Sequence, residues 1–556
     1  MNIRRLSWAL CLSALVGTAV QAEDKQPNFL IILADDLGYS DITSFGGEIN
    51  TPNIDSLASE GVRLTNFHAA PTCSPTRSML MSGTDSHMAG LGNMGELIQP
   101  FQRNQPGYEG YLNERVASVA EVLRDGGYNT YTVGKWHLGR TEETSPAARG
   151  FDRSYILVQG GASHFDDQFA IIGNDPKAIY RENGKQVSAP EGFFSSQFYT
   201  DTMLEYIEQG RSNGKPFFAL LSYTAPHWPL HVPDEWLDKY EGRYAAGYEA
   251  IRQERLARMK EMGLLPANVE ANVPMEDALP SWDQLTDEQK RREARSMELY
   301  ASMVDNMDHH IGRVIDYLKK TGEYDNTFIL FFSDNGADGN NPEDLPGNDV
   351  WMKENFDNSL ENMGRRGSYI AYGPQWAQVS TAPFPFFKGL TSQGGVQVPA
   401  IIRAPQVSQP GTITHEVAHV MDVMPTFLEL AGIEQPSGTY NGREVASIEG
   451  ISMRPILEGK AMPERAIGWE LFGRKALRKG DWKITNMNPP YGTAQWQLYN
   501  LAEDPTESRD LAARHPEKLA ELLKDWEAYV ARNNVLMGEF DLRYGFDTCL
   551  YDRCFK

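Results

Sequence analysis

The stretch NFLIILADD, residues 28–36, decides the fold, because an unbroken apolar run ends there in two adjacent carboxylates. A second stretch of the same kind is TFILFFSDNG at residues 327–336, which ends in Asp334 and Asn335. Shorter apolar runs occupy residues 217–221 and 398–402. Such runs are typical of strands buried on both faces, the pattern of parallel sheets.

Helical patterns lie between these predicted strands. Residues 116–123 are amphipathic and stop at a Gly-Gly pair, and residues 297–318 carry apolar side chains at helical spacing. Alternating strands and helices predict an α/β fold, with a mixed sheet sandwiched by helices. In such sheets polar site residues gather at the carboxyl ends of strands. We therefore expect Asp35, Asp36, Asp334 and Asn335 to share one site.

Two segments do not follow this alternation of strands and helices, and the sequence pattern changes again near the C-terminus. Residues 241–295 are charged, and we predict helices with breaks. Residues 337–385 are rich in Gly, Asn and aromatic residues and show little periodicity, which predicts a long functional loop forming a pocket wall. From about residue 464, short Trp-containing strands precede a helical pattern at 516–530. This predicts a small C-terminal domain with an antiparallel sheet closed by a helix.

Composition excludes several classes of protein. The chain has 556 residues with 41% hydrophobic and 23% charged residues, and its net charge is -23. Its mean hydropathy is -0.47, which is typical of a soluble globular protein long enough for two or more domains. A nucleic-acid binder needs a basic face, and the sequence has no useful Lys/Arg run. We expect neither a nucleic-acid partner nor binding to anionic lipid.

The N-terminus has the pattern of a signal peptide. Arg4 and Arg5 precede a mostly apolar run at 6–16, and Val20-Gln21-Ala22 places small residues where signal peptidase cuts. The run is short for a membrane span, so an anchor is the less favoured alternative and we expect no stable membrane insertion. We predict that residues 1–22 are removed from an exported protein, periplasmic or secreted.

Three cysteines remain after that cleavage. Cys549 and Cys554 are close together, and a disulfide between them is plausible in an oxidising compartment. Cys73 is then left over. It precedes Pro75, a residue suited to the first turn of a helix, and lies one turn before Arg77. A helix start beside a cation stabilises negative charge, so Cys73 is either a nucleophile or a buried inert cysteine.

Wider motifs around Cys73 resemble those of a known family. Cys-Ser-Pro-Thr-Arg at 73–77, followed by LMSG at 80–83, resembles the sulfatase modification signature. GKWHLG at 134–139 resembles the second sulfatase signature. Further matching motifs follow in the family order, and the two C-terminal ones look like bacterial arylsulfatases: DDLGY at 35–39, APH at 225–227, SDNG at 333–336, KG at 388–389, WE at 469–470 and WQLY at 496–499. The resemblance implies an alkaline-phosphatase-like fold.

The resemblance also implies a modified nucleophile. Cys73 would be oxidised to formylglycine by a formylglycine-generating maturation enzyme, which would explain the unpaired cysteine. The hydrated aldehyde is a geminal diol, in which one hydroxyl attacks sulfur and the other expels sulfate. The substrate would be a small-molecule sulfate ester, most readily an aryl sulfate.

A metal site follows from the two strand-end pairs. Asp35, Asp36, Asp334 and Asn335 offer only oxygen ligands, which suit Ca²⁺ or Mg²⁺ rather than zinc. The family resemblance favours calcium over magnesium. Either pair alone is more typical of a strand-end turn or helix cap.

The remaining site residues take their roles from the resemblance. Arg77 and Lys135 would hold the diol, and His137 would take the diol proton during sulfate release. His227 and Lys388 would bind sulfate and protonate the leaving oxygen. The chain departs from the family at Gln393 and Gln397, where many relatives carry Glu and Arg, which puts a local salt bridge in question.

The sequence therefore predicts an exported, calcium-dependent arylsulfatase. Its catalytic domain would span residues 23–460 and its small C-terminal domain residues 461–556. One alternative is a phosphodiester or phosphonate monoester hydrolase on the same fold, because sulfuryl and phosphoryl transfer need similar electrostatics. The other is an inactive anion-binding protein with Cys73 unmodified.

Overall fold

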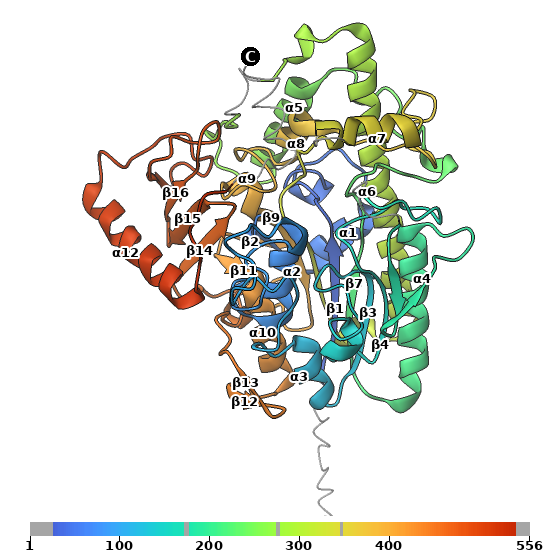
Figure 1. Ribbon diagram of the computed structural model, residues 1–556, viewed down its shortest axis with the longest axis vertical. Helices are drawn as coiled ribbons and strands as arrows, with labels where there is room; N and C mark the ends of the chain where they lie inside the picture. Colours follow the sequence, from blue (N-terminus) through green and yellow to red (C-terminus); the bar gives the residue numbers. More distant parts are fainter. Residues whose placement is uncertain (1–25, 172–176, 274–278, 345–347, 541–556) are drawn as a thin grey trace, which may run out of the picture.

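The computed structural model describes residues 26–171, 177–273, 279–344 and 348–540 (Figure 1). The predicted signal peptide at 1–22 lies outside the described residues. So do Cys549 and Cys554, and their pairing stays a prediction.

A large mixed sheet forms the centre of the protein. Its strand order is β10-β2-β9-β8-β1-β7-β3-β4-β5-β6, and β11 pairs with β2. The strands are β1 Asn28–Ala34, β2 Val62–His68, β3 Asn129–Lys135, β4 Arg153–Leu157, β5 Tyr180–Glu182, β6 Lys185–Val187, β7 Phe217–Ser222, β8 Thr327–Ser333, β9 Gln397–Arg403, β10 Thr412–Thr414 and β11 Ala418–His419. The predicted mixed α/β fold is confirmed.

The central strands β8, β1, β7, β3 and β4 are parallel, whereas β9 runs antiparallel to its neighbours. β1 pairs in parallel with β7 and β8, and β3 pairs in parallel with β4 and β7. The expectation that the apolar run at 398–402 is also a parallel strand is wrong, because β9 runs antiparallel to both β8 and β2. Burial on both faces gives this strand the same apolar pattern as its parallel neighbours.

Helices cover both faces of the sheet (Figure 1). Along β1, Leu30 and Ile32 pack into one core and Phe29 and Ile31 into the other, as the two-residue period of a strand requires. The first core is covered by α1 Pro52–Glu60, α4 Ser195–Gly210 and α6 Asp287–Thr321. The second is covered by α2 Cys73–Ser82, α3 Val119–Asp125 and α10 Val423–Ala431.

The predicted helices exist, but their limits differ. The pattern at 116–123 becomes α3, which begins after Ser118 because this side chain caps the helix. The pattern at 297–318 is the buried part of the longer α6, whose first turns are charged and solvated. Residues 241–295 contain α5 Tyr248–Glu261, as expected. Residues 337–385 are less irregular than predicted, because they include α7 Asn348–Asn355 and α8 Gly373–Ser380.

A second, four-stranded antiparallel sheet follows near the C-terminus. It contains β14 Ala466–Leu471, β15 Arg474–Lys479, β16 Trp482–Asn486 and β17 Gln497–Asn500, and α12 Pro516–Asn533 packs on it through Leu522 and Trp526. The predicted antiparallel sheet closed by a helix is confirmed, whereas a domain boundary at residue 460 stays a prediction. Shorter elements are the hairpin β12 Gly438–Tyr440 and β13 Arg443–Val445, α9 Gln393–Val396 and α11 Arg454–Leu457.

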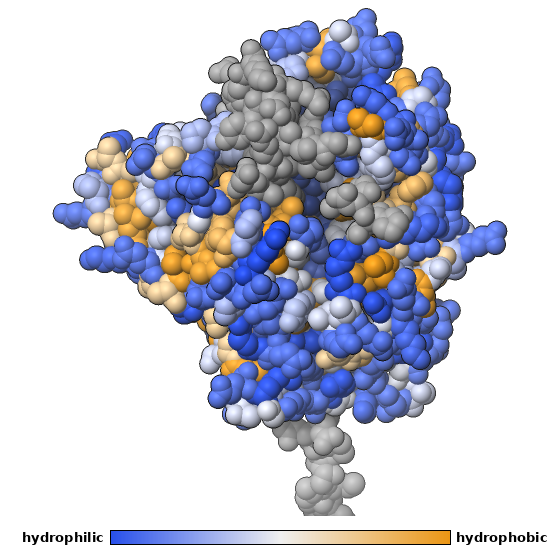
Figure 2. Space-filling view, viewed as in Figure 1, coloured by the Kyte–Doolittle hydropathy of each residue, from blue (hydrophilic) through white to orange (hydrophobic). Residues whose placement is uncertain are grey.

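Hydrophilic side chains cover most of the face shown in Figure 2, in keeping with the net charge of -23. Among the described residues, no helix is both long enough and apolar enough to cross a lipid bilayer.

Candidate active site

The two strand-end pairs meet as predicted. β1 and β8 lie side by side in register, with Ala34 opposite Ser333, so the residues that follow each strand emerge together. The backbone N–H of Asp36 donates to Oδ1 of Asp334 at 3.3 Å. Nδ2 of Asn335 donates to Oδ1 of Asp36 at 2.6 Å. Asp35 completes the group, and all four side chains are buried.

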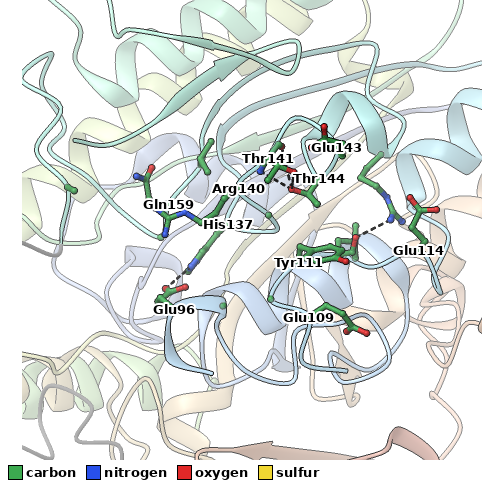
Figure 3. Close-up of a pocket in the computed structure, with 18 of the residues that line it drawn as sticks. Glu96, Glu109, Tyr111, Glu114, His137, Arg140, Thr141, Glu143, Thr144 and Gln159 are labelled. Atoms are coloured by element: carbon green, nitrogen blue, oxygen red, sulfur yellow. Dashed lines mark hydrogen bonds and ion pairs between the residues drawn. The ribbon is translucent and has the colours of Figure 1, made fainter. Parts of the chain in front are cut away.

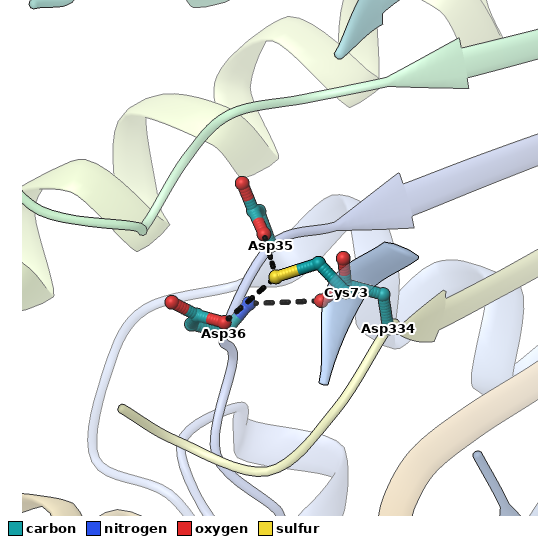
Figure 4. A group of neighbouring side chains, drawn as sticks. All are labelled: Asp35, Asp36, Cys73 and Asp334. Atoms are coloured by element: carbon teal, nitrogen blue, oxygen red, sulfur yellow. Dashed lines mark hydrogen bonds between the residues drawn. The ribbon is translucent and has the colours of Figure 1, made fainter. Parts of the chain in front are cut away.

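Cys73 lies against this group at the start of α2. Its Sγ is 3.6 Å from Oδ1 of Asp35 and 3.8 Å from Oδ1 of Asp36 (Figure 4). One ligand atom from each of Asp35, Asp36, Cys73 and Asp334 lies within 4.8 Å of all the others. Cys73 is therefore a buried free cysteine inside the predicted site.

Three buried cations each contact one of the three carboxylates. Arg77 donates from Nε and Nη2 to Asp334 at 3.0 and 2.8 Å. Nζ of Lys135, the last residue of β3, lies 2.7 Å from both oxygens of Asp35. Nζ of Lys388 lies 2.8 Å from Oδ2 of Asp36. Their arrangement places positive charge around Cys73 without a cation bonded to its sulfur.

Burial sets the protonation of this group. It raises the pKa of Asp35 to about 6, against the attraction of Lys135, and it raises the pKa of Asp36 well above its usual value. Burial acts the same way on Asp334, but Arg77, Lys135 and Lys388 together outweigh it and lower the pKa of that carboxyl. The sequence analysis leaves Cys73 open between a nucleophile and a buried inert cysteine, and its catalytic role stays a prediction. Burial raises the pKa of the Cys73 thiol, and Arg77 is engaged by Asp334.

The residues present fit a hard divalent cation. Oδ1 of Asn335 is buried and has no hydrogen-bond partner among the described residues. The other candidate ligands in this group are the carboxylates of Asp35, Asp36 and Asp334. The pKa values of Asp35 and Asp36 are raised. A buried acceptor without a donor is costly, and an ion would satisfy it. All-oxygen sites of this kind hold Ca²⁺ or Mg²⁺.

His227 and Lys388 both contact Oδ2 of Asp36. Nε2 of His227 is 3.4 Å from Oδ2 of Asp36, and Nδ1 faces the carbonyl oxygen of Trp228. Burial, and then the charge of Lys388, holds the pKa of His227 well below its usual range. Both residues therefore belong to the group around Asp36, and their catalytic roles stay predictions.

Asp338 belongs to the same group and is missed by the sequence analysis. It accepts from Lys388 at 3.1 Å and from Nε1 of Trp228 at 2.9 Å. The only available signal is its spacing, four residues after Asp334 on the segment that leaves β8. Asp338 holds Lys388 between two carboxylates and so fixes where that ammonium group lies.

His137 lies two residues beyond Lys135, and its ring packs against Gly160, next to Gly161, which faces His227. Nε2 of His137 is 2.9 Å from Oε1 of Glu96, and the backbone of His137 is left-handed, with φ of 56° (Figure 3). It reaches a cavity of about 600 Å³ lined by residues 95–96, 109–114, 137–149 and 158–171. Residues of the segment predicted as pocket wall, 337–385, line a separate cavity of about 260 Å³, and Asp338 and Tyr372 also line a small pocket beside Asp36 and His227. The large cavity therefore has walls that the sequence analysis does not identify.

Gln393 and Gln397 stand where many relatives carry Glu and Arg, and the C-terminal region contacts Gln393. Lys483 on β16 donates to Oε1 of Gln393 at 2.8 Å and pairs with Glu507 at 2.7 Å. The backbone N–H of Gln393 donates to the same Glu507 at 2.7 Å. A buried ion pair from the C-terminal region thus holds the loop that follows Lys388.

Comparison with known proteins identifies the family. A family model described as Sulfatase matches residues 27–433. The chain belongs to the sulfatase family. It is 45% identical over 535 residues to an uncharacterized sulfatase of Schizosaccharomyces pombe, covering 94% of this chain and 96% of the relative. It is 38% identical over 471 residues to an arylsulfatase of Klebsiella aerogenes, covering 84% and 99%.

The fold of this sulfatase agrees with solved structures. The crystal structure of Ps i-CgsB in complex with k-i-k-neocarrahexaose superposes with a TM-score of 0.65 at 23% identity. The match covers 95% of this chain and 98% of that one. The chain therefore shares its overall fold with that structure. Sulfate-ester hydrolysis is the activity that membership of the sulfatase family supports.

Proposed function

We propose that this sulfatase is an exported, calcium-dependent arylsulfatase whose nucleophile is formylglycine at position 73. The observation that carries the proposal is the position of Cys73, buried among Asp35, Asp36 and the cations Arg77 and Lys135. The 38% identity to an arylsulfatase over most of both chains supports the substrate class. Residues 1–22 would be the signal peptide, and a maturation enzyme would oxidise Cys73.

The modified residue would supply a hydroxyl nucleophile where the thiol now lies. Calcium held by Asp35, Asp36, Asp334 and Asn335 would offset the charge of the sulfate group. Arg77 and Lys135 are fixed by carboxylates, so they would stabilise developing negative charge without reorganising. Lys388 would bind sulfate from the side of Asp36.

The two histidines would serve different steps. His227 is buried next to Lys388, and its low pKa makes the protonated form a strong acid toward a departing alkoxide or phenoxide. His137 lines the cavity and would accept the proton released at residue 73 when sulfate leaves. This division matches their separate environments, with Asp36 beside His227 and Glu96 beside His137.

The cavity of about 600 Å³ would receive the leaving group. Its size lies in the range of small-molecule sites, and Tyr111, Leu112, Val158 and Ile171 give it apolar surface. Four glutamates and two arginines also line it: Glu96, Glu109, Glu114, Glu143, Arg140 and Arg149. The excess of carboxylates favours an uncharged phenol over a leaving group that carries further sulfates.

A substrate panel tests the reaction class. Turnover of 4-nitrophenyl sulfate should exceed turnover of bis-4-nitrophenyl phosphate and of a phenylphosphonate ester, and a carboxylate on the phenyl ring should raise KM. Peptide mass at position 73 should show formylglycine. Faster phosphodiester turnover would favour the alternative hydrolase, and an unmodified Cys73 with no turnover would favour the anion-binding alternative.

A plot of log rate against leaving-group pKa separates the histidines. His227→Ala should steepen the slope, because a general acid matters most for poor leaving groups, where it contributes about 10²–10⁴-fold. His137→Ala should slow release of sulfate equally for every substrate and produce a burst of phenol. A steeper slope for His137→Ala than for His227→Ala would show that the roles are reversed.

A further inference from the structure

Glu96 is the carboxylate that contacts His137, and no motif in the sequence marks it. It lies on the short 3₁₀ turn Gly95–Leu97, in the connection between α2 and α3. Asn93 holds this turn, donating from Nδ2 to the carbonyl of Leu97 at 2.9 Å and accepting from the N–H of Met94 at 2.8 Å. Glu96 is therefore held in place by its own segment.

The contact fixes the hydrogen positions on His137. Burial alone would raise the pKa of Glu96, but the charge and hydrogen bond of His137, together with a backbone hydrogen bond and the charge of Lys135, lower that pKa to about 2. An ionised carboxylate only accepts, so Nε2 of His137 must carry the hydrogen that lies between them. Neutral imidazole then keeps its lone pair on Nδ1. This Nδ1 is buried and has no hydrogen-bond partner among the described residues.

We propose that Glu96 is a positioning residue that holds His137 in the tautomer with Nδ1 as the base and stabilises the imidazolium formed there. The inference rests on the proposed role of His137 at residue 73. As sulfate leaves, an O–H bond at residue 73 breaks and its electron pair becomes the second carbon–oxygen bond of the aldehyde. The carbon–oxygen bond to sulfate breaks, and sulfate takes that electron pair. The proton passes to Nδ1 and then to water, while Glu96 stays ionised.

The surrounding charges make this carboxylate necessary. Burial lowers the pKa of His137, and Lys135 and Arg77 face it and lower it further. Glu96 is the group that opposes them. Without it, His137 would be a weaker base with either nitrogen free to carry the hydrogen.

The cavity offers a way to replace the carboxylate. Glu96 lines the cavity of about 600 Å³, and its side chain is 30% exposed. A small carboxylate from solution can therefore reach the space that a shorter side chain would leave beside His137. Glu109 lines the same cavity but bonds to Arg115 and to the N–H of Gly107, so it provides a matched control.

The first test reads the tautomer directly. In ¹⁵N-histidine-labelled Cys73→Ala protein, which cannot turn over, long-range ¹H–¹⁵N spectra should show His137 with its hydrogen on Nε2. His137→Asn in the same background assigns the signal. Glu96→Gln should lower the pKa of His137, Glu96→Ala should mix the tautomers, and Glu109→Gln should do neither. A hydrogen on Nδ1, or a His137 signal that ignores Glu96→Ala, would overturn the proposal whether or not the protein is a sulfatase.

The second test measures rescue in the mature enzyme. Glu96→Ala should lower kcat by about 10²-fold, within the range for general acid–base catalysis, with a burst of phenol and little change in burst rate. Formate should restore part of the steady-state rate to Glu96→Ala and none to His137→Ala or Glu109→Gln. A loss confined to KM, with no response to formate, would contradict the positioning role.

Discussion

Two buried charge networks in this sulfatase use the same residue types for opposite purposes. Around Arg255, the guanidinium bonds to Asp41 at 2.6 Å and to Glu48 at 2.7 and 2.8 Å. Tyr300 and Tyr244 donate to the same two carboxylates. Among the described residues, no side-chain polar atom of this network lacks a partner. The network around Cys73 instead leaves Oδ1 of Asn335 without one.

The pKa of Glu48 in the first network shifts in the opposite direction from the pKa values of Asp35 and Asp36 in the second. Burial would raise the pKa of Glu48, but the charge and hydrogen bond of Arg255, together with hydrogen bonds from Tyr244 and the backbone, lower that pKa to about 2. Burial raises the pKa of Asp35 and Asp36 in spite of Lys135 and Lys388. The buried polar atoms of the first network all have partners as the chain folds, whereas the second leaves Asn335 Oδ1 without one and two carboxyls with raised pKa values. A group of this second kind is arranged for a ligand rather than for stability.

The largest expected effect comes from removing the reacting atom of the second network. Cys73→Ala should lower kcat/KM by ~10⁴-fold or more, the scale seen when a nucleophile is lost. Cys73→Ser should turn over at most once, because a plain hydroxyl has no partner hydroxyl to expel sulfate. Both variants should keep the wild-type melting temperature. Undiminished steady-state turnover by Cys73→Ser would sink the formylglycine assignment.

The two networks should differ in how much the free energy of unfolding falls when one charged side chain is replaced. Arg255→Met should lower the free energy of unfolding by about 3–5 kcal/mol, because it removes the nearest cation from two buried carboxylates and leaves Glu48 only the longer contact with Arg258 at 3.4 Å. Asp36→Asn should change it by less than about 1 kcal/mol in calcium-free protein, because Lys388 keeps Asp338 as a partner and a costly buried charge disappears. Urea denaturation of both variants in chelator gives the two values. Equal losses would show that the strand-end network is also structural.

The pH dependence of stability sharpens the contrast. The pKa of Glu48 falls from 4.5 to about 2 on folding. A lowered carboxyl pKa stabilises the protein fully above pH 4.5, and this contribution is lost as the pH falls toward 2. The difference in unfolding free energy between wild type and Glu48→Gln should therefore shrink by ~3 kcal/mol between pH 5 and pH 2. A difference that is constant over this range would show that Arg255 does not hold Glu48 ionised.

Most of the site can be predicted from sequence, because its residues follow buried strands or belong to motifs. Asp35 and Asp334 follow apolar runs whose register can be inferred from parallel pairing. Glu96 and Asp338 cannot be predicted in this way, because they lie on connecting segments. Their side chains contact His137 and Lys388 only through tertiary packing. The antiparallel direction of β9 is missed for a similar reason, since a strand buried on both faces has the same pattern in either direction.

The calcium content of the purified protein tests the central claim most directly, namely that the strand-end carboxylates and Asn335 form a metal site. Elemental analysis after gel filtration should find one calcium per chain in wild type and in Cys73→Ala, and none in Asp36→Asn. The Arg255 network should hold none, so Glu48→Gln should keep its calcium. Stoichiometric zinc in active wild-type protein, or calcium retained by Asp36→Asn, would contradict the account.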